Sequence, residues 1–118
     1  EIAQCLVGSE MCIRDRNKKK EYVGFQTEGH AGYAEAGSDI VCAAASVLVI
    51  NTINAIEAFS DDQASLVSEE AEGFIHYELK NSPSKEADLL LKTMVLGLSE
   101  MAHDEDYAQY IDLTFEEV

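Results

Sequence analysis

The sequence predicts an α+β domain in which two helices pack on a mostly antiparallel sheet, in the order β-β-α-β-β-α-β. Two segments, residues 40–59 and 85–103, carry apolar residues in the amounts and at the spacings that are typical of helices. Shorter segments in which apolar and polar residues alternate occur in pairs around these helices, and polar or glycine-containing turns separate them. The 118 residues, 47% of them hydrophobic, suffice for one domain with its own core.

The first half of this domain is predicted to contain a strand, a loop and a long helix. In residues 21–28 the apolar side chains alternate as in a strand with one buried face. Residues 29–39 contain three glycines and are predicted to form a mobile loop. Asp39 is a good N-cap for a helix from residue 40 to about residue 59. Because this helix is apolar on most sides, we expect it to be buried centrally.

The second half is predicted to contain a hairpin, a helix and a last strand. Residues 64–70 and 74–80 alternate as two strands, with Gly73 in the turn between them. A last strand is predicted over residues 107–115. The helix predicted over residues 85–103 has one apolar face, formed by Leu90, Leu91, Met94, Val95, Leu98 and Met101.

The first sixteen residues differ in character from the remainder. The run CLVGSEMCIRDR, residues 5–16, resembles the conceptual translation of a sequencing adapter, and the sequence does not begin with methionine. We therefore interpret residues 1–16 as a non-native segment in front of the domain formed by residues 17–118. The first strand of the predicted order is then lost, or replaced by this segment.

The chain is strongly acidic, and its charge is unevenly spread. The formal net charge is −15, and residues 21–118 hold 3 basic against 20 acidic residues, a net −17. Such a surface repels nucleic acid and attracts basic partners. A coat of charge that only keeps the protein soluble explains the composition equally well.

Membrane, disulfide and metal-site patterns are missing from the sequence. No apolar run approaches the roughly 20 residues that span a bilayer, and the first residues lack the pattern of a signal peptide, so we expect a cytoplasmic protein without a membrane partner. No metal and no cofactor are expected, because the spacing of the cysteines and histidines fits neither a disulfide framework nor a metal site: Cys5, Cys12, Cys42, His30, His76 and His103.

One histidine and one cysteine flank the predicted loop. His30 follows the strand and Cys42 lies in the first turn of the predicted helix, so both are expected near one edge of the sheet. Unpaired backbone N–H groups and the positive end of the helix dipole favour a thiolate there, and they can stabilise an oxyanion. Cys42 is thus a candidate nucleophile and His30 its base. Asp39 is placed to cap the helix or to orient His30, and capping is favoured because a carboxylate beside Cys42 would oppose a lowered thiol pKa.

A purely structural interpretation of these residues stays open. A cysteine in an alanine-rich helix is more often a small core residue than a nucleophile, and a single histidine at a strand end is usually incidental. Tyr33, within the loop, either lines a pocket for substrate or anchors the loop. Ser46 lies one turn after Cys42 on the same helix face, where it either supports the site or is a packed or back-bonded helix serine.

The run GHAGYAEAGSDIVCAAAS, residues 29–46, closely resembles the signature of the ribosomal-processing cysteine protease Prp family. That signature is GHA, a short variable loop, and then D-x-x-C-x-x-x-S. The resemblance extends over residues 17–118 and fails over residues 1–16. The residues at matching positions are Gly29, His30, Ala31, Asp39, Cys42 and Ser46, and the glycines of the variable loop are Gly32 and Gly37.

The resemblance implies a fold, an activity and a partner. Members of this family are small α+β homodimers that cleave a short N-terminal extension from a protein of the large ribosomal subunit. Their catalytic dyad corresponds to His30 and Cys42, and the loop between the two is thought to order around substrate. A basic ribosomal protein would suit the acidic surface, and the resemblance implies no direct partner among nucleic acids and no cofactor.

Two other classes of function compete with a protease. A non-catalytic ribosome-assembly or protein-binding module could share the fold, and it would bind a partner tightly without turnover. A thiol redox protein is disfavoured because no resolving cysteine lies near Cys42 once residues 1–16 are set aside.

Overall fold

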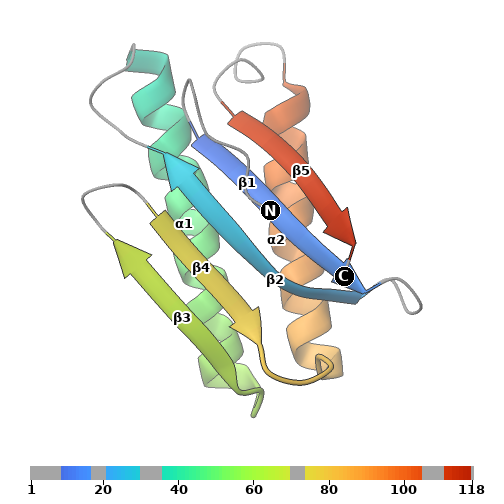
Figure 1. The fold of residues 1–118 in the computed structure, drawn as a ribbon. Coiled ribbons are helices and arrows are strands. Elements are labelled where there is room, and N and C mark those ends of the chain that lie inside the picture. The colour runs from blue at the N-terminus through green and yellow to red at the C-terminus, as the bar shows by residue number, and fades with distance from the viewer. Residues whose placement is uncertain (1–8, 17–20, 30–35, 70–73, 105–110, 118) are drawn as a thin grey trace.

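Helices and strands follow one another in the predicted order, β-β-α-β-β-α-β, in this computed structural model. It describes residues 9–16, 21–29, 36–69, 74–104 and 111–117, with side chains for residues 21–27, 44–69 and 74–104. Both helices lie on the same face of one sheet (Figure 1). The predicted fold class is therefore confirmed. The elements are β1 (Ser9–Arg16), β2 (Glu21–Gly29), α1 (Ala36–Phe59), β3 (Ala64–Glu69), β4 (Phe74–Leu79), α2 (Lys85–His103) and β5 (Ile111–Glu117).

The sheet has five strands in the order β3-β4-β2-β1-β5. The pairs β1–β2, β2–β4 and β3–β4 are antiparallel, whereas β1 and β5 are parallel, so the sheet is mostly antiparallel as predicted. β1 lies between β2 and β5, in the interior of the sheet. The first strand is thus present, and it is formed by residues 9–16 of the segment that we interpreted as non-native.

The core lies between the sheet and the two helices. On the strands, Phe25 and Tyr77 face the helices, and their ring centroids are 5.3 Å apart. On α2, the predicted apolar face is confirmed, because Leu91, Met94 and Leu98 are almost fully buried. Burial of each such large side chain contributes roughly 1.5–3 kcal/mol relative to exposure. This apolar layer fixes the helices on the sheet.

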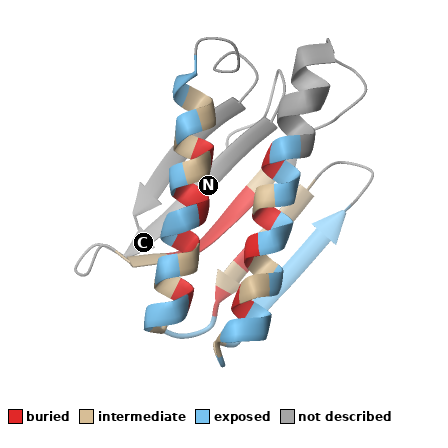
Figure 2. Ribbon diagram, turned by 180° about the vertical axis from the view of Figure 1, so that it is seen from behind, coloured by how far each residue is buried: buried red, intermediate tan, exposed pale blue. Residues whose placement is uncertain are grey.

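α1 is not buried centrally, and this prediction was wrong. Val49 and Ile56 are buried against the sheet, but the side chain of Val47 is 68% exposed and that of Phe59 is 72% exposed. Figure 2 shows this outward, exposed face of both helices. In a fold of two layers, a helix has the sheet on one side only, so even an apolar helix keeps an exposed side. No described helix is long and apolar enough to cross a membrane.

The element boundaries agree closely with the prediction except at two places. The hairpin pairs Ala64 with Leu79 and Glu69 with Phe74, and its turn, residues 70–73, lies outside the described residues. β5 ends at Glu117 rather than at residue 115, and residues 107–110, where the strand was predicted to begin, lie outside the described residues. α1 begins four residues earlier than predicted, which changes the helical positions of the predicted site residues.

Asp62 ties the end of α1 to the start of α2. Ser84 is the N-cap of α2, where its hydroxyl accepts a hydrogen bond from the backbone N–H of Ala87 at 3.1 Å. The Ser84 backbone N–H donates to Asp62 Oδ2 at 2.9 Å, and the Ser84 hydroxyl donates to Asp62 Oδ1. Partial burial raises the pKa of Asp62, but the hydrogen bonds from Ser84 and Ser60 outweigh it, so the pKa lies below its ordinary value.

The variant Asp62→Asn is expected to lower the free energy of unfolding by about 1–2 kcal/mol at neutral pH, because the charge-assisted hydrogen bonds to Ser84 are lost. Because folding lowers the pKa of Asp62, its stabilisation is present above the unfolded-state value and is lost as the pH falls through the folded-state value. Urea unfolding of the unaltered protein and of Asp62→Asn should therefore give different free energies of unfolding at neutral pH and equal ones in acid. Asp61→Asn, which changes the exposed neighbouring carboxylate, is the matched control; an equal loss in both variants would contradict this role of Asp62.

Candidate active site

The predicted catalytic residues fall on the connection between β2 and α1. β2 ends at Gly29, which is paired with Ser9 of β1. His30 follows directly, and it lies with Ala31, Gly32 and Tyr33 outside the described residues. α1 begins at Ala36, so the structure places both ends of the connecting segment, and the pairing of His30 with Cys42 stays a prediction.

The start of α1 corrects the predicted roles of two residues. Gly37 and Asp39 are the second and fourth residues of the helix, so Gly37 is not in the loop and Asp39 is not the N-cap. Cys42 is the seventh helical residue, about 9 Å along the axis from Ala36. In an α-helix its backbone N–H bonds to the carbonyl of Ser38, so it is not one of the unpaired N–H groups.

This position changes the chemistry expected of Cys42. The field of the helix dipole falls off within the first turn, and Cys42 lies in the second turn. The helix therefore favours a thiolate less than the sequence suggested, and the prediction of a nucleophilic Cys42 depends more on the predicted pairing with His30. Asp39, in the first turn, still suits the dipole as an acidic residue.

Ser46 is the one signature residue whose side chain the structure describes. It follows Cys42 by four residues on α1, and its side chain is exposed. Exposure contradicts the alternative that Ser46 is a packed core serine. Its supporting role at the site stays a prediction.

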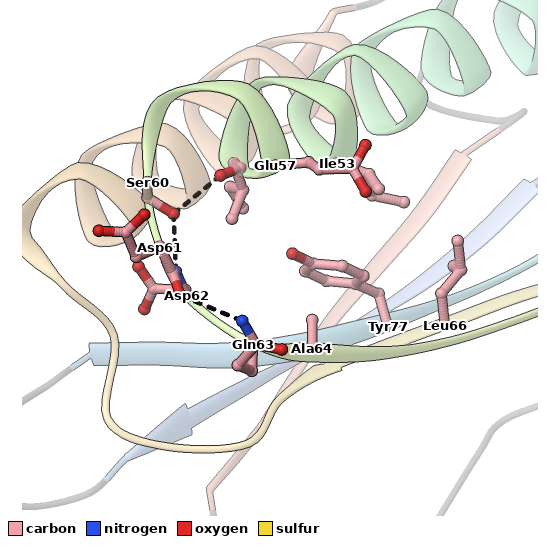
Figure 3. A pocket seen from close by; sticks show the side chains of 10 residues that line it. Ile53, Glu57, Ser60, Asp61, Asp62, Gln63, Ala64, Leu66 and Tyr77 are labelled. Carbon is pink, nitrogen blue, oxygen red and sulfur yellow. Dashed lines mark hydrogen bonds between the residues drawn. The ribbon is translucent and has the colours of Figure 1, made fainter.

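The structure also contains a cavity that the sequence did not indicate. It has a volume of about 430 Å³ and lies beside the C-terminal end of α1, with Tyr77 in its wall (Figure 3). Burial, followed by the negative charges of Asp62 and Glu57, raises the pKa of Tyr77 to about 12. The alternation along β4 predicts an inward side chain at Tyr77, but no sequence pattern shows that residues so far apart enclose a cavity. Among the described residues, no group of three or more His, Cys, Asp or Glu side chains could hold a metal ion.

Comparison with known proteins assigns the family. The sequence model of the family "Cysteine protease Prp" matches residues 11–112. The ribosomal processing cysteine protease Prp of Bacillus subtilis is 30% identical over 93 residues, which cover 75% of this chain and 83% of that protein. The chain therefore belongs to the Prp family of cysteine proteases. Because the match begins at Met11, the expected lack of resemblance over residues 1–16 is wrong for residues 11–16.

Solved structures agree with this assignment. The ribosomal processing protease Prp of Staphylococcus aureus in complex with a substrate peptide superposes with a TM-score of 0.82 at 27% identity, covering 92% of this chain and 99% of that chain. The same protease with a covalently linked product peptide gives a TM-score of 0.79 at 28% identity over the same shares of the two chains.

Proposed function

We propose that this protein is a cysteine endopeptidase that removes a short N-terminal extension from a protein of the large ribosomal subunit, with Cys42 as nucleophile and His30 as general base and acid. The observation that carries the proposal is the motif of residues 29–46 within a chain of the Prp family. The related Staphylococcus aureus protease supports it, since one structure of that protein holds a substrate peptide and another a covalently linked product peptide. A covalent link to a peptide is what nucleophilic catalysis produces.

In this mechanism the thiolate of Cys42 attacks the carbonyl carbon of the scissile bond and forms a C–S bond. The imidazolium of His30 then protonates the leaving amine as the C–N bond breaks, which releases the mature protein and leaves a thioester. Neutral His30 next takes a proton from water, whose oxygen forms a C–O bond with the thioester carbon. The C–S bond then breaks, which frees the extension with a new C-terminal carboxylate and returns the Cys42 thiolate beside protonated His30. Ser46 and Asp39 support the site, as do Gly29 at the end of β2 and Gly37 in α1. Ala31, Gly32 and Tyr33 shape the connection that orders around the substrate.

The acidic chain suits a basic substrate. The net charge of −15 would raise the rate at which a positively charged ribosomal protein meets the enzyme. At cellular salt this attraction reaches only about 8 Å, so it acts near the surface. The proposal further comprises a homodimer that works in the cytoplasm, without nucleic acid, membrane or cofactor.

The test is to incubate the purified chain with a large-subunit ribosomal protein that carries its extension, and to follow the mass of the product. We expect cleavage at one peptide bond and a single new N-terminus. The same ribosomal protein without its extension is the control and should stay intact. Tight binding without any shortening would refute the peptidase and would favour the non-catalytic assembly module.

A further inference from the structure

The cavity beside the C-terminal end of α1 lies far along the helix from the predicted nucleophile, Cys42. Its walls come from the last turns of α1, from residues 60–63, and from β3 and β4. Cys42 and Ile53 are eleven residues apart on α1, which corresponds to about 16 Å along the axis. The volume of about 430 Å³ is within the range of roughly 300–1,000 Å³ that is usual for ligand sites. The cavity is therefore large enough for a ligand and separate from the scissile bond.

Tyr77 points its hydroxyl group into this cavity. The residue is only 4% exposed, and its ring packs on Phe25. Figure 3 shows the hydroxyl directed to the open space between α1 and β3. No hydrogen bond joins this hydroxyl to another described residue, and it is not one of the buried atoms without a partner, so it reaches the open space of the cavity. Water or a bound ligand can form a hydrogen bond with it there.

The charges around the cavity favour a cation. Glu57, Asp61 and Asp62 line it, and no lysine or arginine is found among its described lining residues. Both carboxylate oxygens of Asp62 already accept hydrogen bonds from Ser84, and no described group of side chains has the arrangement that a metal ion needs. The negative charge is thus spread around the cavity rather than focused on one point. Such a field suits an organic cation better than a metal ion.

Part of the remaining wall is apolar, next to the polar residues Ser60 and Gln63. Ile53 of α1 lies across the cavity from Ala64 and Leu66 of β3 (Figure 3). Ile56 of α1 also lines the cavity. Lysine and arginine side chains combine an alkyl stem, which binds to apolar walls, with a cationic end, which binds to carboxylates and to a hydroxyl oxygen. These two parts correspond to the two kinds of wall in this cavity.

We propose that this cavity binds a lysine or arginine side chain of a basic polypeptide, with the cationic group donating to the Tyr77 hydroxyl near Glu57. The polypeptide is favoured over a free amine because a chain of net charge −15 attracts a partner with many positive charges more strongly than a small cation. Taking that polypeptide to be the ribosomal substrate rests on the proposed function. The cavity would then hold the body of the substrate while its extension is cleaved elsewhere.

Binding is tested by titrating the full chain with the blocked peptide Gly-Lys-Lys-Gly and following amide NMR shifts. We expect saturable shifts at residues 53–64 and at Tyr77. Tyr77→Phe should weaken binding about tenfold, because it removes the hydrogen bond to a charged group. Its melting temperature should stay unchanged, since that hydroxyl bonds to no described group. Glu57→Gln should weaken binding about threefold, as expected for an exposed charge.

The matched control is Glu100→Gln, which removes an equally exposed glutamate near the C-terminal end of the other helix, α2. It should leave binding unchanged. Equal binding of the peptide Gly-Gln-Gln-Gly, or equal weakening by Glu57→Gln and Glu100→Gln, would overturn the proposal. Equally tight binding of free 1,5-diaminopentane would overturn the assignment to a polypeptide.

Cleavage assays separate this inference from the proposed function. With the whole ribosomal protein, Glu57→Gln should raise KM about threefold at unchanged kcat, and it should leave the kinetics of a short junction peptide unaltered. If the chain cleaves neither substrate, the proposed function fails, while the peptide titration still decides the cavity. If the chain cleaves both and Glu57→Gln changes neither KM, the role of the cavity in substrate binding is refuted.

Discussion

Replacing Cys42 by alanine is expected to lower the rate of cleavage by about 10⁴-fold or more, because no other group can form the thioester. The substitution removes one sulfur atom in the second turn of α1, where alanine is a good helix former. The protein should therefore fold and still bind its substrate. The measurement is the single-turnover rate of cleavage of a peptide that spans the end of the extension, with circular dichroism to verify the fold.

Two other cysteines provide the control for this experiment. Cys5→Ala and Cys12→Ala each remove a thiol outside the motif of residues 29–46, and both should keep the rate of the unaltered protein. Cleavage that persists in Cys42→Ala would exclude Cys42 as nucleophile. Cys12 lies on β1, outside the motif. Loss of activity in Cys12→Ala alone would therefore also contradict the assignment of Cys42 as nucleophile.

The position of Cys42 in α1 makes a second measurement informative. Since the helix dipole acts only weakly in the second turn, a low thiol pKa must depend on His30. The pH dependence of alkylation by iodoacetamide should therefore give an apparent pKa below the free value of about 8.5, and His30→Ala should return it close to that value. An equally low value in both proteins would mean that another group stabilises the thiolate.

Local signals in the sequence were sufficient to predict a helix or strand wherever its own residues determine its position. Helix α2 was predicted to its terminal residues, because the polar run before Lys85 supplies the cap Ser84 and because its apolar residues repeat at helical spacing. The hairpin of β3 and β4 was equally clear from its alternation and its turn. In these segments local preference and tertiary packing agree.

Prediction failed where tertiary contacts override a local signal. Asp39 is a favourable N-cap, yet α1 continues through Gly37 back to Ala36. The apolar sequence of α1 suggested burial on all sides, but the number of layers in a fold is not encoded in one helix, and Val47 stays exposed. The cavity at Tyr77 could not be predicted because Asp62 and Tyr77 come together only through the pairing of β3 with β4.

The position of Gly24 on β2 is a further feature that only the structure explains. Gly24 pairs with Glu78 of β4 and is buried. A Cβ atom at this position would lie 2.6 Å from the backbone oxygen of Tyr77 and 3.1 Å from the Cα of Glu78. Both neighbours are backbone atoms in a paired strand, so they cannot move aside without disturbing the β2–β4 ladder. Only glycine fits this close approach.

Gly24→Ala is accordingly expected to destabilise the protein by about 3 kcal/mol, the upper part of the range for overpacking a core, because β2 and β4 must separate locally. Urea unfolding followed by circular dichroism measures the effect. Gly97→Ala is the matched control: a Cβ at Gly97 would lie 3.2 Å from Cδ1 of Leu48, the movable end of a side chain, and alanine favours a helix by about 1 kcal/mol. The control should change stability by less than about 1 kcal/mol. An equal loss of stability in the two variants would show that the β2–β4 ladder tolerates a methyl group at residue 24. The close backbone contact would then not be the reason for glycine at this position.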